Sequence, residues 1–140
     1  MTLPAILAPV FAQVLLVFFL LFWMGGTRAA AVRAGEVRPR EGSPRNYGWP
    51  AKAQQVSDCF HHQFEIPTLF FALVPLAILS RKADLLFVTL SWVFVATRFL
   101  HAVEHTGANR LKFRFPLFAA GVIVLAVMWA VFAVRILLNA

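Results

Sequence analysis

The chain has 140 residues and a formal charge of +7, and 61% of its residues are hydrophobic whereas 14% are charged. Soluble domains carry about 25% charged residues, so this composition excludes an ordinary water-soluble globule and predicts an integral membrane protein. The positive charge lies between apolar segments rather than along one amphipathic face, which favours an orienting role in the membrane over nucleic-acid binding.

Four apolar stretches follow one another along the chain. They cover about residues 3–24, 64–80, 85–100 and 115–138, and only Gln13 interrupts the first. A membrane-spanning helix needs about 20 residues, and the second and third stretches reach this length only if their polar ends are helical too. We therefore predict one domain, residues 1–140, with transmembrane helices at about 3–26, 54–80, 84–106 and 115–138.

Helices are favoured over strands because the runs lack period-two alternation and a backbone in lipid must satisfy its own hydrogen bonds. The fold class expected is an all-α, polytopic four-helix membrane bundle. Pro67 and Pro75 fall inside the second predicted helix, where each removes one backbone donor, while Pro116 suits the first turn of the fourth.

Basic residues concentrate in two of the three connections. The first connection holds Arg28, Arg33, Arg38, Arg40, Arg45 and Lys52. The third holds Arg110, Lys112 and Arg114, whereas the second holds Arg81 and Lys82. Because positive loops stay in the cytoplasm, the first and third connections are predicted to be cytoplasmic and both termini outside.

Ionisable residues form two stripes at the ends of the predicted helices. The first stripe is spaced i, i+3, i+4, i+7 and consists of Asp58, His61, His62 and Glu65. The second consists of Arg98, His101 and His105, with Glu104 beside it. Each spacing places its residues on one helical face. A short turn joins the two helices as antiparallel neighbours, so the stripes are expected to face each other.

Three interpretations of these stripes remain open. Asp58 and Glu65 could pair with Arg98, Arg110 or Arg114 in a structural ion-pair network. A transition metal could be held by Asp58, His61, His62, His101 and His105, although nearby arginines oppose a dication. A polar cavity could instead bind an anionic thiol compound through its arginines, since an adjacent guanidinium favours the thiolate.

The pattern Arg98-x-x-His101-x-x-x-His105-x-x-x-x-Arg110-x-x-x-Arg114, together with Glu65 on the second helix, resembles the MAPEG family. These are membrane-associated proteins of eicosanoid and glutathione metabolism, and the stretches HHQFEIPTLF and RFLHAVEHTGANRLKFRF are most similar to a bacterial branch. The resemblance implies a homotrimer with cavities between adjacent subunits, glutathione as cosubstrate, and lipophilic electrophiles as substrates. The bacterial branch implies the inner membrane of a bacterium.

Individual roles can be transferred by this resemblance. Glutathione-using relatives carry Arg-x-x-x-Asn-x-x-Glu on the second helix; here the glutamate is Glu65, whereas Asp58 and His62 occupy the other two places. His105 stands where a tyrosine is found, and Arg114 corresponds to the arginine that stabilises the thiolate. Replacing an arginine by Asp58 removes a charge that binds carboxylates.

The resemblance thus implies catalytic roles for Arg114 and His105. Cosubstrate binding is expected from Arg28, His62, Glu65, Arg98, His101 and Arg110. Three functions follow: a glutathione- or thiol-dependent transferase or peroxidase, a non-catalytic binding or assembly protein that has lost the cosubstrate, and a metal-binding membrane protein.

Overall fold

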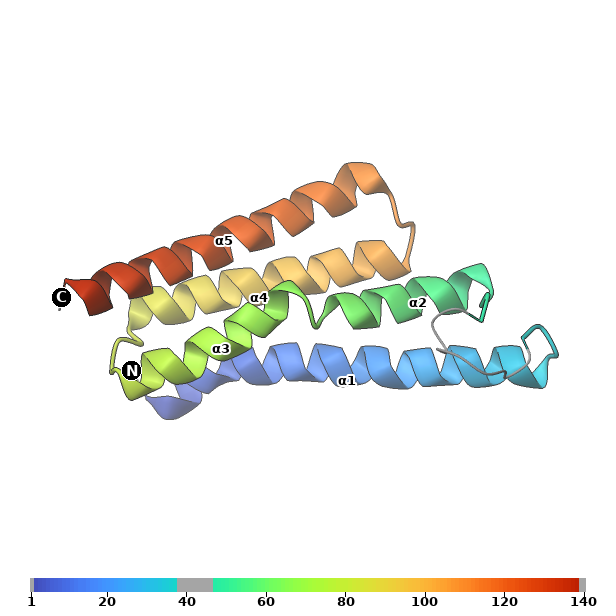
Figure 1. Ribbon diagram of the computed structural model, residues 1–140, viewed down its shortest axis with the longest axis horizontal. Coiled ribbons are helices and arrows are strands. Elements are labelled where there is room, and N and C mark those ends of the chain that lie inside the picture. The colour runs from blue at the N-terminus through green and yellow to red at the C-terminus, as the bar shows by residue number, and fades with distance from the viewer. Residues whose placement is uncertain (1, 38–46, 139–140) are drawn as a thin grey trace.

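Figure 1 shows the computed structural model, which describes residues 2–37 and 47–138. Within these residues the chain forms helices that lie roughly side by side: α1 (Leu3–Arg33), α2 (Ala51–His62), α3 (Ile66–Leu79), α4 (Leu85–Thr106) and α5 (Leu111–Leu137). Helices α2 and α3 make one interrupted rod, so the bundle has four rods. Arg38, Arg40 and Arg45 lie outside the described residues.

The four rods are long and apolar enough to cross a membrane, which confirms the predicted all-α membrane fold. The candidate spans are Leu3–Arg33, Ala51–Leu79, Leu85–Thr106 and Lys112–Leu137. Large apolar side chains such as Phe22 and Leu15 are 73% and 68% exposed on the outside of α1. In a bilayer these side chains face lipid tails, which are as apolar as they are.

Helix α1 is longer than the sequence predicts, because it continues past Gly25 and Gly26 to Arg33. Each glycine costs a helix about 1 kcal/mol relative to alanine, but the following Ala29, Ala30 and Ala31 are the best helix formers. At the other end, the Thr2 hydroxyl accepts a hydrogen bond from the backbone N–H of Ala5 at 3.3 Å. At its C-terminal end, α1 runs about two turns past the expected end at residue 26 and thus includes Arg28 and Arg33.

The second predicted helix is broken between His62 and Ile66, which the sequence analysis did not foresee. Pro67 has no N–H to continue the hydrogen-bond ladder, and its ring disfavours the helical conformation of the preceding residue. The buried Gln63 side chain stabilises the break, since its Nε2 donates to the Cys59 carbonyl at 3.2 Å and its Oε1 accepts from Gln13 Nε2 at 2.9 Å. Pro75 stays inside α3 as predicted.

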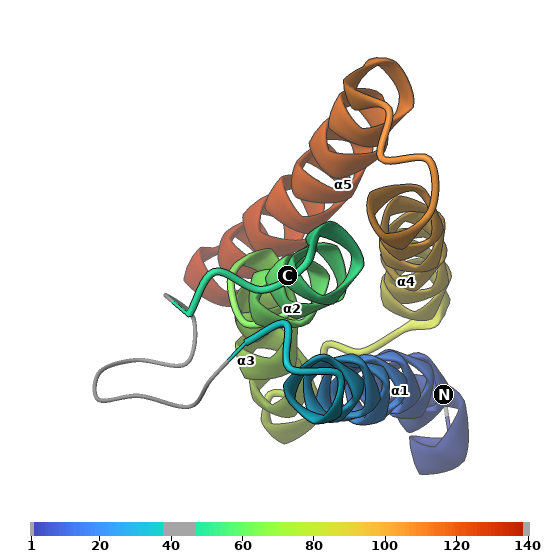
Figure 2. The ribbon, with the colours of Figure 1, turned by 90° about the vertical axis from the view of Figure 1, so that its right-hand side faces the viewer.

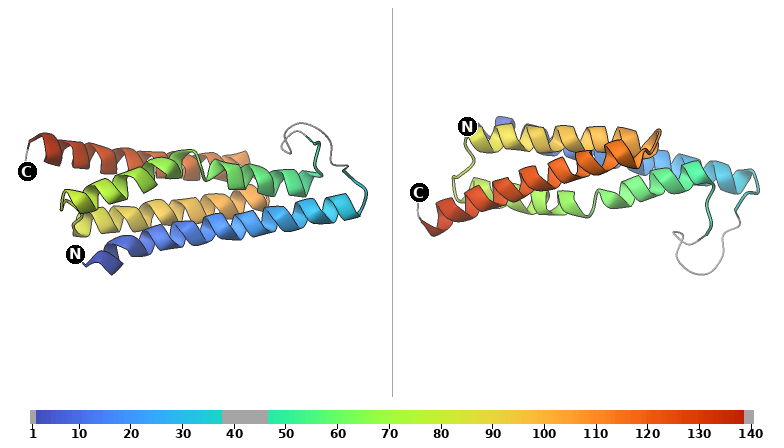
Figure 3. Two further views of the ribbon diagram at one scale, coloured as in Figure 1. Left: turned by 60° about the horizontal axis from the view of Figure 1, so that its bottom comes forward. Right: turned by 90° about the horizontal axis from the view of Figure 1, so that it is seen from above.

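The two ends of the bundle differ in what they contain (Figures 1 and 3). Both described chain ends lie at the same end of the bundle as the turn between α3 and α4. The connections between α1 and α2 and between α4 and α5 share the opposite end. Viewed along the rods, α5 crosses obliquely beside α2 and α4 (Figure 2). We call the half of the bundle near the chain ends the terminal half, and the half near the α1–α2 and α4–α5 connections the connection half.

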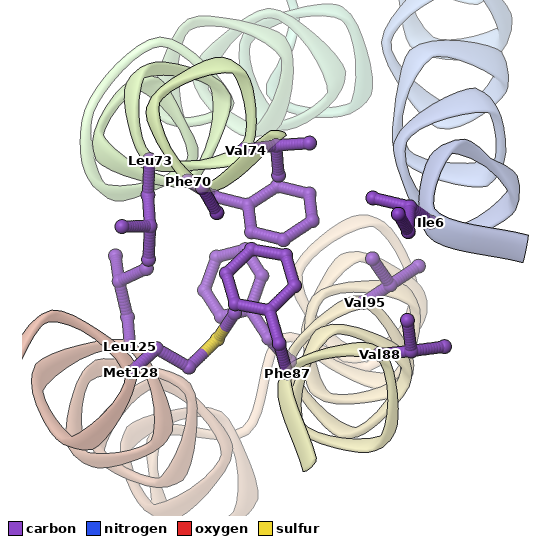
Figure 4. Close-up of a cluster of buried hydrophobic side chains, with 11 residues drawn as sticks. Ile6, Phe70, Leu73, Val74, Phe87, Val88, Val95, Leu125 and Met128 are labelled. Carbon is purple, nitrogen blue, oxygen red and sulfur yellow. The ribbon is translucent and has the colours of Figure 1, made fainter. Parts of the chain in front are cut away.

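The apolar core lies in the terminal half and joins α1, α3, α4 and α5 (Figure 4). Phe70 and Phe94 are fully buried with ring centroids 5.0 Å apart, and Leu125 and Met128 of α5 pack against the same cluster. Close-packed aromatic and aliphatic side chains of this kind dominate the energy of a folded interior. The core is almost wholly apolar, and the buried Ser91 of α4 bonds within its own helix, its hydroxyl donating to the Phe87 carbonyl at 2.8 Å.

Asp84 and Arg135 close the terminal half with an ion pair of 2.8 Å between Oδ2 and Nη1. Asp84 also caps α4, because its Oδ1 accepts a hydrogen bond from the Phe87 N–H at 3.0 Å. Partial burial raises the pKa of Asp84, but the Phe87 N–H and the Arg135 guanidinium outweigh it and hold that pKa below its usual range. The carboxylate is therefore ionised across the physiological pH range.

Candidate functional site

The polar stripe on α2 and the break that follows it all face one cavity in the connection half. Asp58, His61 and His62 reach this cavity from the last two turns of α2. Glu65 reaches it from the break, where its Oε2 lies 3.0 Å from Nδ1 of His62. The interruption of the helix thus keeps all four residues on one surface, as the spacing predicts for an uninterrupted helix.

Helix α4 contributes His101 and His105, and these meet His62 in a cluster of three imidazoles. The rings of His62 and His101 are stacked with centroids 4.9 Å apart and planes inclined by 29°. The His105 ring lies 6.2 Å from His62 and 5.6 Å from His101, close to perpendicular to each. The two stripes therefore face each other, as antiparallel neighbours should.

The third wall of the cavity comes from α5. Its volume is about 450 Å³, and it is lined by Asp58, His61, His62, Glu65, His101, His105, Arg114, Phe115 and Phe118. The Phe118 ring lies 5.3 Å from His62 and 6.1 Å from His101. The sequence analysis missed both phenylalanines, although Phe118 follows Arg114 by one helical turn and that spacing could have indicated it.

Several buried ring nitrogens of the histidine cluster have no hydrogen-bond partner among the described residues. They are His62 Nε2, His101 Nδ1 and His105 Nδ1. Buried polar atoms in folded proteins are nearly always hydrogen-bonded, and leaving one unpaired costs about 1–3 kcal/mol. A site that collects three such atoms around a cavity is suited to a polar ligand that completes their hydrogen bonds.

Arg114 is the only arginine or lysine among the described residues that lines this cavity. Its Nη1 donates to Asn109 Oδ1 at 2.7 Å, and within the described ranges no carboxylate lies within ion-pair distance. Asn109 has a positive φ of 53°, a conformation that asparagine tolerates better than most residues. The turn between α4 and α5 thus positions a guanidinium whose charge is not neutralised by the protein.

Arg110, expected beside Arg114 in the site, is instead directed towards Glu104. Its Nε lies 2.9 Å from Glu104 Oε1, and the same oxygen accepts a hydrogen bond from the Arg110 backbone N–H at 3.0 Å. The Glu104 carboxylate raises the pKa of Arg110 above its usual value. This pair closes the α4–α5 turn and leaves Arg110 off the cavity wall.

Arg28 and Arg98, two other residues expected in the site, also lie off the wall. Arg28 Nη2 donates to the Ser57 hydroxyl at 2.6 Å, and its guanidinium lies 5.1 Å from the centroid of the Trp49 ring. Arg98 is 1% exposed, one turn before His101 on α4, and its Nε and Nη2 have no hydrogen-bond partner in the described part of the chain. Arg98 therefore acts on the cavity only as a buried charge.

The metal-site hypothesis finds no support in this geometry. In residues 2–37 and 47–138 no group of three or more His, Cys, Asp or Glu side chains is arranged to hold a metal ion. The His62 ring is stacked on His101, and its Nδ1 already lies 3.0 Å from Glu65 Oε2, so this nitrogen is engaged by a carboxylate. A metal would also sit near the uncompensated charge of Arg114.

A second groove, of about 790 Å³, lies between α1 and α4 on the other side of the bundle. It is mainly apolar, with Leu15, Phe19 and Val103 among its lining residues and Lys52 at its polar end. It shares no lining residue with the cavity lined by His62, His101 and His105, which we call the histidine cavity. A molecule in this groove would be separated from the histidines by helix α4.

Comparison with known proteins shows to which family this four-rod chain belongs. Residues 6–134 match the family model described as the MAPEG family. The chain belongs to the MAPEG family. The matched segment includes every residue that lines the histidine cavity of this MAPEG protein. No curated protein and no solved structure matches the chain significantly.

Proposed function

We propose that this MAPEG protein is a thiol-dependent transferase that binds a thiol such as glutathione in the histidine cavity and adds it to lipophilic electrophiles from the bilayer. Members of the family generally use glutathione. The observation that carries the proposal is Arg114, a cation without a carboxylate partner on a cavity whose other polar groups include three unpaired imidazole nitrogens.

The proposed role of Arg114 is to favour the reactive form of the thiol. A free thiol ionises near pH 8.5, and a neighbouring guanidinium lowers this value because it stabilises the thiolate, which is the nucleophile. Removal of a charge contact in a desolvated cavity changes affinity by about 1.4 kcal/mol or more, a factor of ten. Arg114 is thus the residue whose loss should weaken thiolate binding most.

His105 is proposed to carry the proton in this reaction. Its ring lies on the cavity wall with a buried, unpartnered Nδ1, which is placed to accept a hydrogen bond or a proton from a bound thiol. The thiol proton passes to His105 as the sulfur attacks the electrophilic carbon and the sulfur–carbon bond forms. When the electrophile is an activated double bond, its π electrons move to the neighbouring carbon, which takes the proton from His105. When it is a halide, the halide ion leaves with the electrons of the carbon–halogen bond, and His105 releases the proton to water.

A peroxidase reaction would begin with the same thiolate. It would attack a lipid hydroperoxide oxygen, releasing the lipid alcohol once a proton is supplied and leaving a sulfenic acid. A second thiol then forms a disulfide with release of water. The transferase reaction is the simpler test, because it consumes a single thiol.

Phe115 and Phe118 suggest where the lipophilic partner approaches. Phe115 lines the cavity and is 64% exposed, so it offers an apolar surface at the mouth of the cavity. An apolar molecule dissolved in the bilayer can therefore contact the aromatic wall without crossing the polar one. The thiol, by contrast, is expected to enter from the water near the α4–α5 turn.

The experiment is equilibrium thiol binding by purified protein, read from the ultraviolet absorbance of bound thiolate and from turnover with an electrophilic aryl halide. Arg114→Ala should weaken binding tenfold or more. Lys112→Ala is the matched control, because Lys112 is an exposed cation two residues earlier that does not line the cavity, and it should change binding less than about twofold.

Two results separate the alternatives. If neither glutathione nor any smaller thiol binds at millimolar concentration, the transferase is excluded and a binding or assembly protein is left. If thiols bind but Arg114→Ala and Lys112→Ala have equal effects, Arg114 does not hold the thiolate.

We also infer that the connection half faces the cytoplasm of a bacterial inner membrane and that the protein is a homotrimer. The first inference is supported by Arg28, Arg33 and Lys52 at that end, against Arg81 and Lys82 at the other. The second is supported by the family, whose members are generally trimeric. Labelling of single cysteines from either side of intact cells tests the orientation, and the mass of the detergent-solubilised protein tests the trimer.

A further inference from the structure

The charged groups of the cavity wall are separated by sign. Both acidic residues, Asp58 and Glu65, come from the α2 side, whereas the cation Arg114 comes from α5. All three line one cavity of about 450 Å³, so a small molecule can contact opposite charges at the same time. The remaining polar wall consists of histidines.

Two of these charges have only neutral partners in the described part of the chain. Asp58 Oδ1 accepts a hydrogen bond from the Gln54 amide at 2.7 Å, and Arg114 donates to the Asn109 amide at 2.7 Å. Glu65, by contrast, is paired with His62 at 3.0 Å. The cavity therefore has one uncompensated negative charge and one uncompensated positive charge, on facing walls.

The buried side of the cavity also has an unpaired polar atom with which a polar ligand could form a hydrogen bond. His101 is 2% exposed, lines the cavity and has no partner for its Nδ1 among the described residues. The acidic pair is therefore part of a built cavity and not an isolated patch on the surface. A ligand between Asp58 and Arg114 would occupy the same cavity as this nitrogen.

We propose that the preferred thiol is a small aminothiol, whose ammonium group pairs with Asp58 while its thiolate faces Arg114. This inference rests on the proposed function and narrows its substrate class. Glutathione fits less well, because its ammonium group can also pair with Asp58 but its two carboxylates find no second cation on the wall that the described residues form. Arg110 is engaged by Glu104, and Arg98 and Arg28 lie off the wall.

The test compares two probes of almost equal size and opposite charge, cysteamine and mercaptopropionate, with glutathione as a third. Wild-type protein should bind cysteamine about tenfold more tightly than mercaptopropionate, since one carries an ammonium group towards Asp58 and the other a carboxylate. Asp58→Asn should reduce this preference to within about threefold, and Asp58→Lys should reverse it.

Glu104→Gln is the matched control, because it removes a carboxylate at the same end of the bundle that does not line the cavity. It should leave the preference unchanged. Asp58 is exposed, so its variants should fold, and their thermal unfolding checks this. Equal affinity for both probes, or a preference for mercaptopropionate, overturns the aminothiol class while leaving a thiol transferase intact. Failure of all three thiols to bind overturns the proposed function and this inference together.

Discussion

The two halves of the bundle use their interiors differently. In the terminal half, Phe70, Phe94 and Met128 fill the space between helices with apolar side chains. In the connection half, His62 and His101 stack against each other and line a cavity instead. The same pair of antiparallel rods runs through both halves, so helix association alone does not require the histidines.

The difference indicates where stability and where function are located. The apolar core leaves few unsatisfied groups, Trp129 Nε1 being one, whereas each unpaired buried polar atom costs about 1–3 kcal/mol. Arg98, His101 and His105 each contribute such atoms in the connection half. The unpaired polar atoms cost stability, and we expect a ligand in the connection half to complete their hydrogen bonds. Substitutions in the terminal half should therefore change mainly stability, and those in the connection half mainly binding.

The largest effect on stability should come from the terminal half. Phe94→Ala removes a fully buried ring from the core and should lower the free energy of unfolding by about 3–5 kcal/mol. Thermal unfolding in detergent measures this, with Phe22→Ala as control, because Phe22 is 73% exposed and should change stability by less than about 0.5 kcal/mol. Equal losses from both variants would show that the cluster around Phe94 is not the stabilising core.

Arg98→Met should weaken binding without lowering stability, in contrast to Phe94→Ala. Methionine fills a similar volume without a charge, so removing this buried, unpaired guanidinium should leave stability unchanged or increase it by about 1–4 kcal/mol. Thiolate binding should fall about fivefold, because a positive charge behind the histidines is lost. A large loss of stability with unchanged binding would assign Arg98 to the structure alone.

Glu65→Ala should have a smaller effect on stability. The Glu65 side chain is 64% exposed and its pair with His62 lies at the surface, so the loss should be below about 1 kcal/mol. His62 should lose its fixed orientation, and binding should weaken for cysteamine and glutathione alike. A change in the preference between these thiols would instead mean that Glu65, and not only Asp58, reads the charge of the ligand.

The smallest effect should come from the ion pair that closes the terminal half. The pKa of Asp84 is held low in the folded protein, so its carboxylate contributes stability above the unfolded pKa of about 3.9 and loses it as pH falls through the folded value. Asp84→Asn should lower stability at pH 7 by about 0.5 kcal/mol. The difference from wild type should shrink as pH falls below about 4. A difference that persists in acid would mean that the capping hydrogen bond, not the charge, is responsible.

Helical periodicity was sufficient to predict most of the cavity wall. Asp58, His61 and His62 share a face of α2 because their spacing follows the helical repeat, and a short turn between rods forces α4 to oppose them. The transmembrane fold followed in the same way from segment length and apolar composition. These features depend on local geometry, which a single sequence contains.

The positions of the arginines could not be predicted in this way. Arg110 follows Asn109, whose positive φ turns the chain, so the guanidinium meets Glu104 rather than the cavity. Arg28 depends on the extension of α1 past Gly26 and on its contact with Ser57. The break at Gln63 also depends on a distant partner, Gln13. Long side chains and breaks are decided by tertiary contacts, which periodicity does not contain.

The most direct test of the account is an experimental map of the protein with cysteamine bound, obtained by crystallography or electron microscopy. We expect density bounded by Asp58, His105 and Arg114, with the sulfur on the Arg114 side. Density confined to the apolar groove between α1 and α4, or a histidine cavity closed by its own side chains, would contradict a thiol site in the connection half.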